Sequence, residues 1–448
     1  MKSFVIKPGS FLNGRASFLG DKSIAHRAII LSAISPSITI IKNFPDNQDC
    51  LSTIKAFQKL GVKIFLKKND IETKSLTVIV SGAGLFGLKA PKKPIYVGDS
   101  GTTLRIILGI LSGQNFSARL IAGKSLSKRP MLRVTAPLRL MGADIKSQGH
   151  QVTRSQEEFA PIIIRGSKLK AIEYKMPVAS AQVKSALLLA GLYAKGTTKV
   201  IDKFKTRDHT EHMLKLFNAN IKVKGSNIKI QGNKNLVSPK KIFIPGDISS
   251  ASFFIILALI SKKAKLVLEN ISLNPTRSGV IKVLKRMGAK IKHLAPNTYN
   301  LKYEPMGDIL VASSKLKATI VKKNEIPALI DELPILMVAA CLAKGKTTFK
   351  GIQELRLKET DRIKSMSENL IKMGADISLI KKGKSEDIVI HGIREFKAAN
   401  LKSFGDHRTA MSLIVAGLVA KGKSRIDDIS CINKSFPDFI SLVKRVVK

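Results

Sequence analysis

The 448 residues, 44% of them apolar, suffice for two or three domains with substantial cores. The formal net charge of +45 raises the question of nucleic-acid binding, but the lysines are scattered and aromatic residues, at 5% with no Trp, leave few surfaces for stacking bases. The charge is better explained by lysines on solvated faces, or by a site for small anions within a positive field, and no nucleic-acid partner is expected.

An apolar helix recurs six times along the chain, at a spacing of roughly 70 to 80 residues. After most copies, a Gly or polar stop leads into alternating β-branched residues, which is typical of a helix that ends and runs into a strand. The predicted copies cover residues 25–33, 103–111, 183–193, 251–260, 333–342 and 409–419.

A second helix type alternates with the first and closes at a Gly or Asn, the residues that tolerate a left-handed cap. The closing residues are Gly61, Gly142, Asn218, Gly288 and Gly374. Each repeat is thus predicted to be βαβαββ, in an α/β fold of two similar lobes with three repeats each. The predicted lobes are residues 21–245, and residues 1–20 plus 246–448.

The starts of the first helix type combine capping residues with basic ones. Ser, Thr and Asp are ordinary caps. A helix N-terminus beside Lys or Arg, however, is an anion site. Equivalent repeats would direct these starts at one cleft between the lobes, which suits substrates rich in phosphate and carboxylate. The starts are 20–23, 98–103, 180–182, 246–250, 331–332 and 405–408.

Two further segments are dense in charge. Residues 124–130 form a basic loop stopped by Pro130. In residues 355–362 we interpret Lys358 and Arg362 as like charges four apart on one helix face, which is unfavourable without an anion between them. Both segments therefore favour a binding role.

Several patterns point away from metals, nucleotides and membranes. Cys50, Cys341 and Cys431 form no C-x-x-C pair and suit a reducing cytoplasm. The G-x-G-x-x-G match at 82–87 precedes prolines rather than a helix, so a dinucleotide site is not predicted. His209 and His212 have no apparent third metal ligand, and the apolar runs are too short to span a bilayer.

Six segments in order resemble the EPSP synthase family, the 3-phosphoshikimate 1-carboxyvinyltransferases. They are 21–27, 101–105, 128–130, 180–182, 355–362 and 406–411. The resemblance covers essentially the whole chain. It implies an inside-out α/β barrel, the enolpyruvyl transferase fold, whose two lobes enclose the active site. It also implies transfer of the enolpyruvyl group of phosphoenolpyruvate to the 5-hydroxyl of shikimate 3-phosphate, on the path to chorismate and aromatic amino acids.

The resemblance also implies roles for individual residues. Expected to bind shikimate 3-phosphate are Lys22, Ser23, Arg27, Ser180, Gln182, Arg207, Asp331 and Lys358. Expected to bind phosphoenolpyruvate are Lys22, Gly101, Arg129, Gln182, Arg362 and Arg408. The expected catalytic residues are Asp331 as base for the 5-hydroxyl, with Lys358 sharing that role, Glu359 as proton donor to the methylene carbon, and Lys22. No metal or organic cofactor is expected, and the enzyme is expected to be a cytoplasmic monomer.

Two details depart from a simple match. Asp99 stands where the family commonly has Asn, which changes the charge beside the phosphoenolpyruvate site. Gly101 is the small residue typical of glyphosate-sensitive members, whereas 180–182 and 207–211 look more like the less sensitive branch, so competitive inhibition by glyphosate is a hypothesis. Two alternatives stay open: the sister enzyme acting on a UDP-sugar, which usually has a Cys within the loop 124–130, and a basic nucleic-acid-binding protein.

Overall fold

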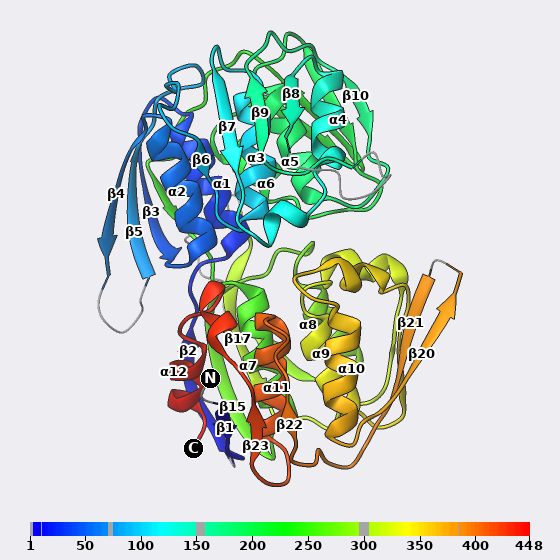
Figure 1. The fold of residues 1–448 in the computed structure, drawn as a ribbon. Helices are drawn as coiled ribbons and strands as arrows, with labels where there is room; N and C mark the ends of the chain where they lie inside the picture. The colour runs from blue at the N-terminus through cyan, green and yellow to red at the C-terminus, as the bar shows by residue number, and fades with distance from the viewer. Residues whose placement is uncertain (1–2, 10, 70–74, 149–156, 295–303, 384) are drawn as a thin grey trace. The chain divides into compact units, whose positions relative to one another are not determined.

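The computed structural model describes residues 3–9, 11–69, 75–148, 157–294, 304–383 and 385–448 (Figure 1). The chain divides into two compact units, each with its own hydrophobic core. The N-terminal unit comprises Leu19–Ile244 and Lys302–Glu304. The C-terminal unit comprises Met1–Phe18, Pro245–Leu301 and Pro305–Lys448.

In the N-terminal unit, the described strands form three four-stranded sheets with one shared pattern. A parallel pair lies at one edge of each sheet, and two antiparallel pairings follow. In order across the sheets, the strands are β14 (Lys241–Phe243), β3 (Ile38–Pro45), β5 (Ser75–Ser81) and β4 (Lys63–Lys68); β6 (Ile95–Tyr96), β7 (Ser117–Ile121), β9 (Ile162–Arg165) and β8 (Asp144–Ser147); and β10 (Glu173–Lys175), β11 (Thr197–Ile201), β13 (Asn227–Gln231) and β12 (Ile221–Lys224).

Two kinds of helix pack against these sheets. α1, α3 and α5 are buried over almost their whole length, whereas α2, α4 and α6 bury one face. In Figure 1, α1 and α2 lie against the sheet formed by β3, β5 and β4. The helices are α1 (Lys22–Ala33), α2 (Gln48–Lys59), α3 (Gly101–Leu111), α4 (Leu132–Leu140), α5 (Ala181–Gly191) and α6 (His209–Leu216), with a 3-10 turn, η1 (Leu126–Lys128).

The C-terminal unit repeats this plan in two four-stranded sheets, and its third sheet has three described strands. Its sheets are β2 (Phe11–Ser17), β15 (Lys263–Ser272), β17 (Met306–Ala312) and β16 (Lys290–His293); β18 (Ile320–Val321), β19 (Lys346–Phe349), β21 (Ser385–His391) and β20 (Asp376–Lys382); and β22 (Asn400–Leu401), β23 (Ser424–Ile426) and β1 (Phe4–Ile6). Its helices are α7 (Ile248–Ile260), α8 (Gly279–Arg286), α9 (Leu333–Cys341), α10 (Arg362–Lys372), α11 (His407–Leu418) and α12 (Phe439–Val446), with 3-10 turns η3 (Lys323–Ala328), η4 (Gln353–Leu357) and η5 (Ser430–Lys434).

Three sheets take a strand from a distant part of the chain. β14, at the end of the N-terminal unit's sequence, pairs in parallel with β3 near its beginning. In the C-terminal unit, β2 pairs in parallel with β15, and β1 pairs with β23. The segment before residue 19 therefore completes sheets of the C-terminal unit.

The predicted α/β class and its repeated unit are confirmed, including the left-handed residue after each second-type helix. The φ angles are +87° at Gly61, +96° at Gly142, +56° at Asn218, +88° at Gly288 and +91° at Gly374. A residue with positive φ turns the chain out of the helix and into the next strand.

The predicted start segments of the first-type helices agree with the structure. Five of them contain the first helical residue, which is Lys22, Gly101, Ala181, Ile248 or His407, and α9 begins at Leu333, directly after the predicted start 331–332. In most copies the predicted apolar run begins two or three residues later, because the first turn of the helix contains polar residues beside the cap.

The interpretation of Lys358 and Arg362 as neighbours on one helix is wrong. Lys358 follows η4 with φ −85° and ψ −157°, an extended backbone, and Arg362 is the first residue of α10. The four-residue spacing therefore does not place their charges on one helix face. No helix in the described part of the chain is both long and apolar enough to cross a bilayer.

Candidate active site

Three helix starts in the N-terminal unit carry predicted binding residues, and each is capped by a side chain. Asp21 Oδ1 accepts a hydrogen bond from Ile24 N at 3.0 Å, and Ser100 and Ser180 cap α3 and α5 in the same way. Such ends leave backbone N–H groups and the positive end of the helix dipole near the surface. Lys22, in the first turn of α1, pairs through Nζ with Asp49 at 2.9 Å.

Arg27 is 3% exposed and fixed by neutral oxygens. Its Nε donates to Thr210 Oγ1 at 2.6 Å and its Nη2 to Ser185 Oγ at 2.8 Å. Its Nη1 donates to the Ser23 carbonyl at 2.7 Å. Burial lowers the pKa of Arg27 to about 10; nearby Glu211 opposes this shift.

Arg207 contributes to the same positive field, because its charge also lowers the pKa of Arg27. The arrangement brings Ser23, Arg27 and Arg207 together in one part of the N-terminal unit. Ser23, Arg27 and Arg207 thus form a cationic group suited to a phosphate.

A buried ion triad, which sequence reasoning missed, supports this group. Lys184 Nζ lies 3.0 Å from Asp202 Oδ2 and 2.7 Å from Glu211 Oε1. Asp202 Oδ2 also accepts from Thr206 N at 2.9 Å and so fixes the residue before Arg207. No sequence pattern indicates this triad, since a Lys inside an otherwise apolar helix is normally expected to reach solvent.

A chain of hydrogen bonds joins α1 to α3 through α2. His26 Nδ1 lies 2.6 Å from Thr53 Oγ1, which lies 2.7 Å from Thr103 Oγ1, which in turn lies 2.7 Å from the cap Ser100 Oγ. Burial lowers the pKa of His26 to about 3, so its ring is neutral at physiological pH. These hydrogen bonds hold the first turns of α1 and α3 in a fixed position relative to each other.

Asp99 organises the basic loop that was predicted to bind phosphoenolpyruvate. Its Oδ1 accepts hydrogen bonds from Ser125 N at 3.0 Å and Leu126 N at 2.9 Å. This caps the turn η1 that leads to Arg129. An Asn could make the same two acceptor contacts, so Asp in place of Asn changes the local charge without requiring a different loop.

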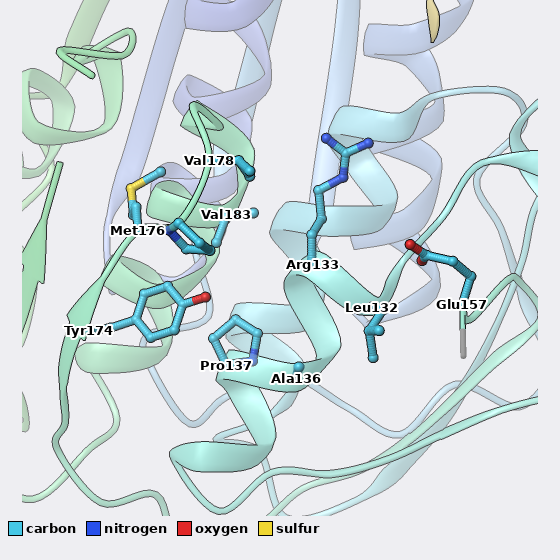
Figure 2. Close-up of a pocket in the computed structure, with 10 residues that line it drawn as sticks. Leu132, Arg133, Ala136, Pro137, Glu157, Tyr174, Met176, Val178 and Val183 are labelled. Carbon is cyan, nitrogen blue, oxygen red and sulfur yellow. The ribbon is translucent and has the colours of Figure 1, made fainter. Parts of the chain in front are cut away.

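A pocket of about 320 Å³ lies beside the start of α5 (Figure 2). Its lining is mostly apolar and comes from α4, from residues 174–178 before α5, from Val183 on α5 and from Glu157. Its polar members are Arg133, Glu157 and Tyr174. None of the predicted site residues lines this pocket. It is therefore a neighbour of the predicted binding residues rather than their location.

In the C-terminal unit, Arg362 is the centre of the predicted site. Its side chain is 1% exposed. Its Nε lies 3.0 Å from Asp406 Oδ2, its Nη2 lies 2.5 Å from Glu359 Oε2, and its Nη1 lies 3.6 Å from Asp331 Oδ1. Burial alone would lower the pKa of Arg362, but the three carboxylates raise it, so the guanidinium stays charged.

Asp331 lies between two guanidinium groups. Besides Arg362, Arg277 approaches it, with Nη1 3.7 Å from Asp331 Oδ2. Arg408 Nη1 donates to the Asp331 carbonyl at 2.8 Å and lies 3.8 Å from Glu332 Oε1. Arg277 was missed in the sequence, because a lone Arg after the turn that begins at Asn274 carries no recognisable signal.

The loop that carries Lys358 and Glu359 is fixed at its two ends. Arg356 pairs with Asp361 at 2.5 Å and with Glu386 at 2.5 Å, and Asp361 caps α10. Within this frame Lys358 is half-buried and Glu359 is exposed. A titratable pair is thereby presented on a rigid support.

The predicted residues thus divide between the two units. The N-terminal unit contributes Lys22, Ser23, Arg27, Gly101, Arg129, Ser180, Gln182 and Arg207. The C-terminal unit contributes Asp331, Lys358, Glu359, Arg362 and Arg408. Among the described residues, no group of three or more His, Cys, Asp or Glu side chains is placed to hold a metal ion.

The repeated βαβαββ units and their cationic helix starts define an enolpyruvyl transferase fold. The family model for EPSP synthase (3-phosphoshikimate 1-carboxyvinyltransferase) matches residues 6–442. The chain belongs to the EPSP synthase family.

Individual relatives agree over their full lengths. A 3-phosphoshikimate 1-carboxyvinyltransferase of Petrotoga mobilis is 44% identical over 443 residues, which cover 98% of each chain. One from a Geobacter species is 43% identical over 448 residues, covering all of both chains. A solved EPSP synthase from Acinetobacter baumannii has a TM-score of 0.88 at 40% identity and covers 100% of this chain and 98% of its own.

The predicted reaction is confirmed at the level of the family. The enzyme is a transferase of the shikimate pathway that moves the enolpyruvyl group of phosphoenolpyruvate onto shikimate 3-phosphate and releases phosphate. The UDP-sugar and nucleic-acid-binding alternatives do not account for this family membership.

Proposed function

We propose that the groups in the two units act together on one pair of substrates, in a cleft between the lobes. Shikimate 3-phosphate is held by Lys22, Ser23, Arg27, Ser180, Gln182, Arg207, Asp331 and Lys358. Phosphoenolpyruvate is held by Lys22, Gly101, Arg129, Gln182, Arg362 and Arg408.

One observation supports the assignment most directly: a single buried guanidinium gathers the candidate base and the candidate acid. Arg362 lies 3.6 Å from Asp331 and 2.5 Å from Glu359. Its buried Nη1 has no hydrogen-bond partner within the described chain. A carboxylate or phosphate oxygen of phosphoenolpyruvate would supply that acceptor and place the reacting carbons beside both carboxyl groups.

The proton transfers then follow from the chemistry. Glu359 protonates the methylene carbon, which makes the adjacent carbon electrophilic, while Asp331 with Lys358 takes the proton of the 5-hydroxyl. The 5-oxygen attacks that carbon and forms a tetrahedral adduct. Loss of phosphate and return of the methyl proton to the enzyme regenerate the enolpyruvyl double bond. No electrons leave or enter, so the reaction needs no redox cofactor.

The cationic groups stabilise the adduct, because it carries a phosphate and a carboxylate on one carbon. Arg129 and Arg408 can each make two parallel hydrogen bonds to such groups. Fixed charges in a site that excludes water stabilise the adduct more strongly than solvent does. Closure of the two units over the substrates would complete the site.

The test is phosphate release from shikimate 3-phosphate and phosphoenolpyruvate, with a UDP-sugar acceptor in a parallel reaction. Loss of a general acid typically costs about 10²–10⁴-fold, so Glu359→Gln should lose at least 100-fold in kcat. Glu354→Gln is the matched control, since Glu354 is an exposed carboxyl in η4. The assignment of Glu359 is wrong if the two variants turn over alike, and Lys22→Ala tests the N-terminal group in the same way.

We also propose that the enzyme acts as a cytoplasmic monomer without nucleic acid. One chain supplies every residue of the proposed site, so no second copy is needed. Light scattering of the purified enzyme should give a mass near 48.9 kDa. A salt-sensitive complex with duplex DNA at physiological ionic strength would contradict the proposal that the enzyme acts without nucleic acid.

A further inference from the structure

Arg105 is a buried cation to which the mechanism above gives no role. It lies on α3, about one helical turn after Gly101, and is 6% exposed. It forms no ion pair with any residue that the structure describes, and its buried Nε has no hydrogen-bond partner there. Burying a charge without a counter-ion is costly, so such a group implies that an anion binds nearby.

The surroundings of Arg105 add positive charge rather than neutralise it. Burial, followed by the charges of Arg133 and Arg129, lowers the pKa of Arg105 to about 9, with no carboxylate among the causes. Most of the molecule's other buried arginines differ: Arg277 and Arg362 lie against carboxylates. The N-terminal unit therefore holds a group of three arginines, Arg105, Arg129 and Arg133, in which no described carboxylate pairs with the buried Arg105.

The guanidinium of Arg105 also contacts the proposed phosphoenolpyruvate residues. Its Nη1 donates to Gln182 Oε1 at 2.9 Å, and its Nη2 donates to the Pro130 carbonyl at 3.3 Å, directly after Arg129. A Cβ at Gly101 would lie 2.8 Å from Nη1. Arg105 is thus beside three segments that the resemblance assigns to phosphoenolpyruvate, of which Gln182 is assigned to shikimate 3-phosphate as well.

These contacts determine which way the Gln182 amide faces. Arginine has only donors, so the atom of Gln182 that it contacts must be the amide oxygen. The amide nitrogen then donates to Thr102 Oγ1 at 3.0 Å. Without Arg105 the amide could rotate and present oxygen, instead of N–H, toward an anionic ligand.

We propose that Arg105 is a positioning residue for phosphoenolpyruvate, which holds the Gln182 amide with its N–H groups toward the substrate side and adds an unneutralised positive charge to the Arg129 group. This inference rests on the proposed function. It assigns to Arg105 a selective effect on the second substrate, since its contacts lead to Gly101, Gln182 and Arg129 and not to Arg27 or Arg207.

The experiment compares Arg105→Met and Arg105→Lys with Arg133→Met. Arg133 is exposed and adds to the same field but has no hydrogen bond to Gln182, so it is the control for charge alone. Initial rates of phosphate release give kcat and the KM of each substrate. Phosphoenolpyruvate-induced thermal stabilisation, measured with shikimate 3-phosphate present, gives binding independently of turnover.

In Arg105→Met the KM for phosphoenolpyruvate should rise at least tenfold, while the KM for shikimate 3-phosphate stays within twofold. Arg105→Lys, which keeps the charge but loses the two-pronged contact, should show at least a threefold rise and serves if the Met variant does not fold. Arg133→Met should stay within twofold for both substrates.

Three results would overturn the role of Arg105: an unchanged KM for phosphoenolpyruvate, equal changes for both substrates, or an equal effect of Arg133→Met. Failure of the proposed function looks different, because the wild-type enzyme itself would then release no phosphate. In that case the thermal shift with phosphoenolpyruvate still decides the role of Arg105.

Discussion

Replacing Lys184 by Met should destabilise the N-terminal unit by several kcal/mol. The side chains of Lys184, Asp202 and Glu211 are 2%, 2% and 5% exposed. The methionine keeps most of the aliphatic stem, so the change removes the cation and leaves two buried carboxylates without it. Breaking a buried ion pair from one side typically costs about 3–5 kcal/mol.

The expected size can be checked by urea unfolding followed by far-UV circular dichroism. With a urea m-value of about 1–3 kcal/mol/M, the unfolding midpoint should fall by about 1 M or more. Lys199→Met is the matched control: Lys199 pairs with Glu173 at 3.1 Å, but both side chains are partly solvated. Such a surface pair is worth about 0–1 kcal/mol.

The loss should depend on pH with a definite sign. In the wild type, burial would raise the pKa of Asp202, but Lys184 and Thr206 outweigh it and the pKa is lowered. Its contribution to stability is therefore present at neutral pH and lost as pH falls through the folded pKa. Without the cation, burial favours the protonated form of Asp202, so the deficit of the variant should shrink as pH falls from 7 toward about 4.

The same variant should weaken binding of shikimate 3-phosphate, because Asp202 fixes Thr206 beside Arg207. The reasoning would be refuted if the free energy of unfolding of Lys184→Met at pH 7 were within about 1 kcal/mol of the wild-type value, as an unchanged urea midpoint would indicate. So would a deficit that grows on acidification.

Gly101→Ala should raise the KM for phosphoenolpyruvate about tenfold, since the new Cβ displaces the Arg105 guanidinium 2.8 Å away, and initial-rate kinetics check this. Competitive inhibition of the unmodified enzyme by glyphosate stays a prediction for the same assay. Arg362→Lys keeps the charge but loses the fork, so kcat should fall about 10–100-fold, the value of one or two charged hydrogen bonds; equal kcat would contradict it. Asp99→Asn should leave the KM for phosphoenolpyruvate within about twofold because both acceptor contacts survive, whereas Asp99→Ala should raise it about tenfold by freeing the Arg129 loop. Similar KM values in the two Asp99 variants would count against that role.

The repeat was readable from the sequence because periodic apolar runs and left-handed residues such as Gly142 are local features. The helix starts were also predictable, since a capping residue such as Asp21 beside Lys22 is a local signal, whereas the apolar runs alone begin two or three residues later. The resemblance of the motifs predicted which residues belong to the candidate site. It did not predict the contacts among those residues, which only the structure shows. Arg277 and Lys184 were missed because their partners lie far along the chain, where only the folded backbone brings them together.

The strand exchange between chain ends bears on how this protein can be taken apart. A fragment that starts at residue 245 would lack β2 and β1, and would expose the backbone of β15 and β23 as open edges prone to pairing with other molecules. During synthesis the first eighteen residues emerge long before the strands they pair with. A separable C-terminal unit would need those residues joined in front of Pro245, so gene fusion and not simple truncation is the way to isolate it.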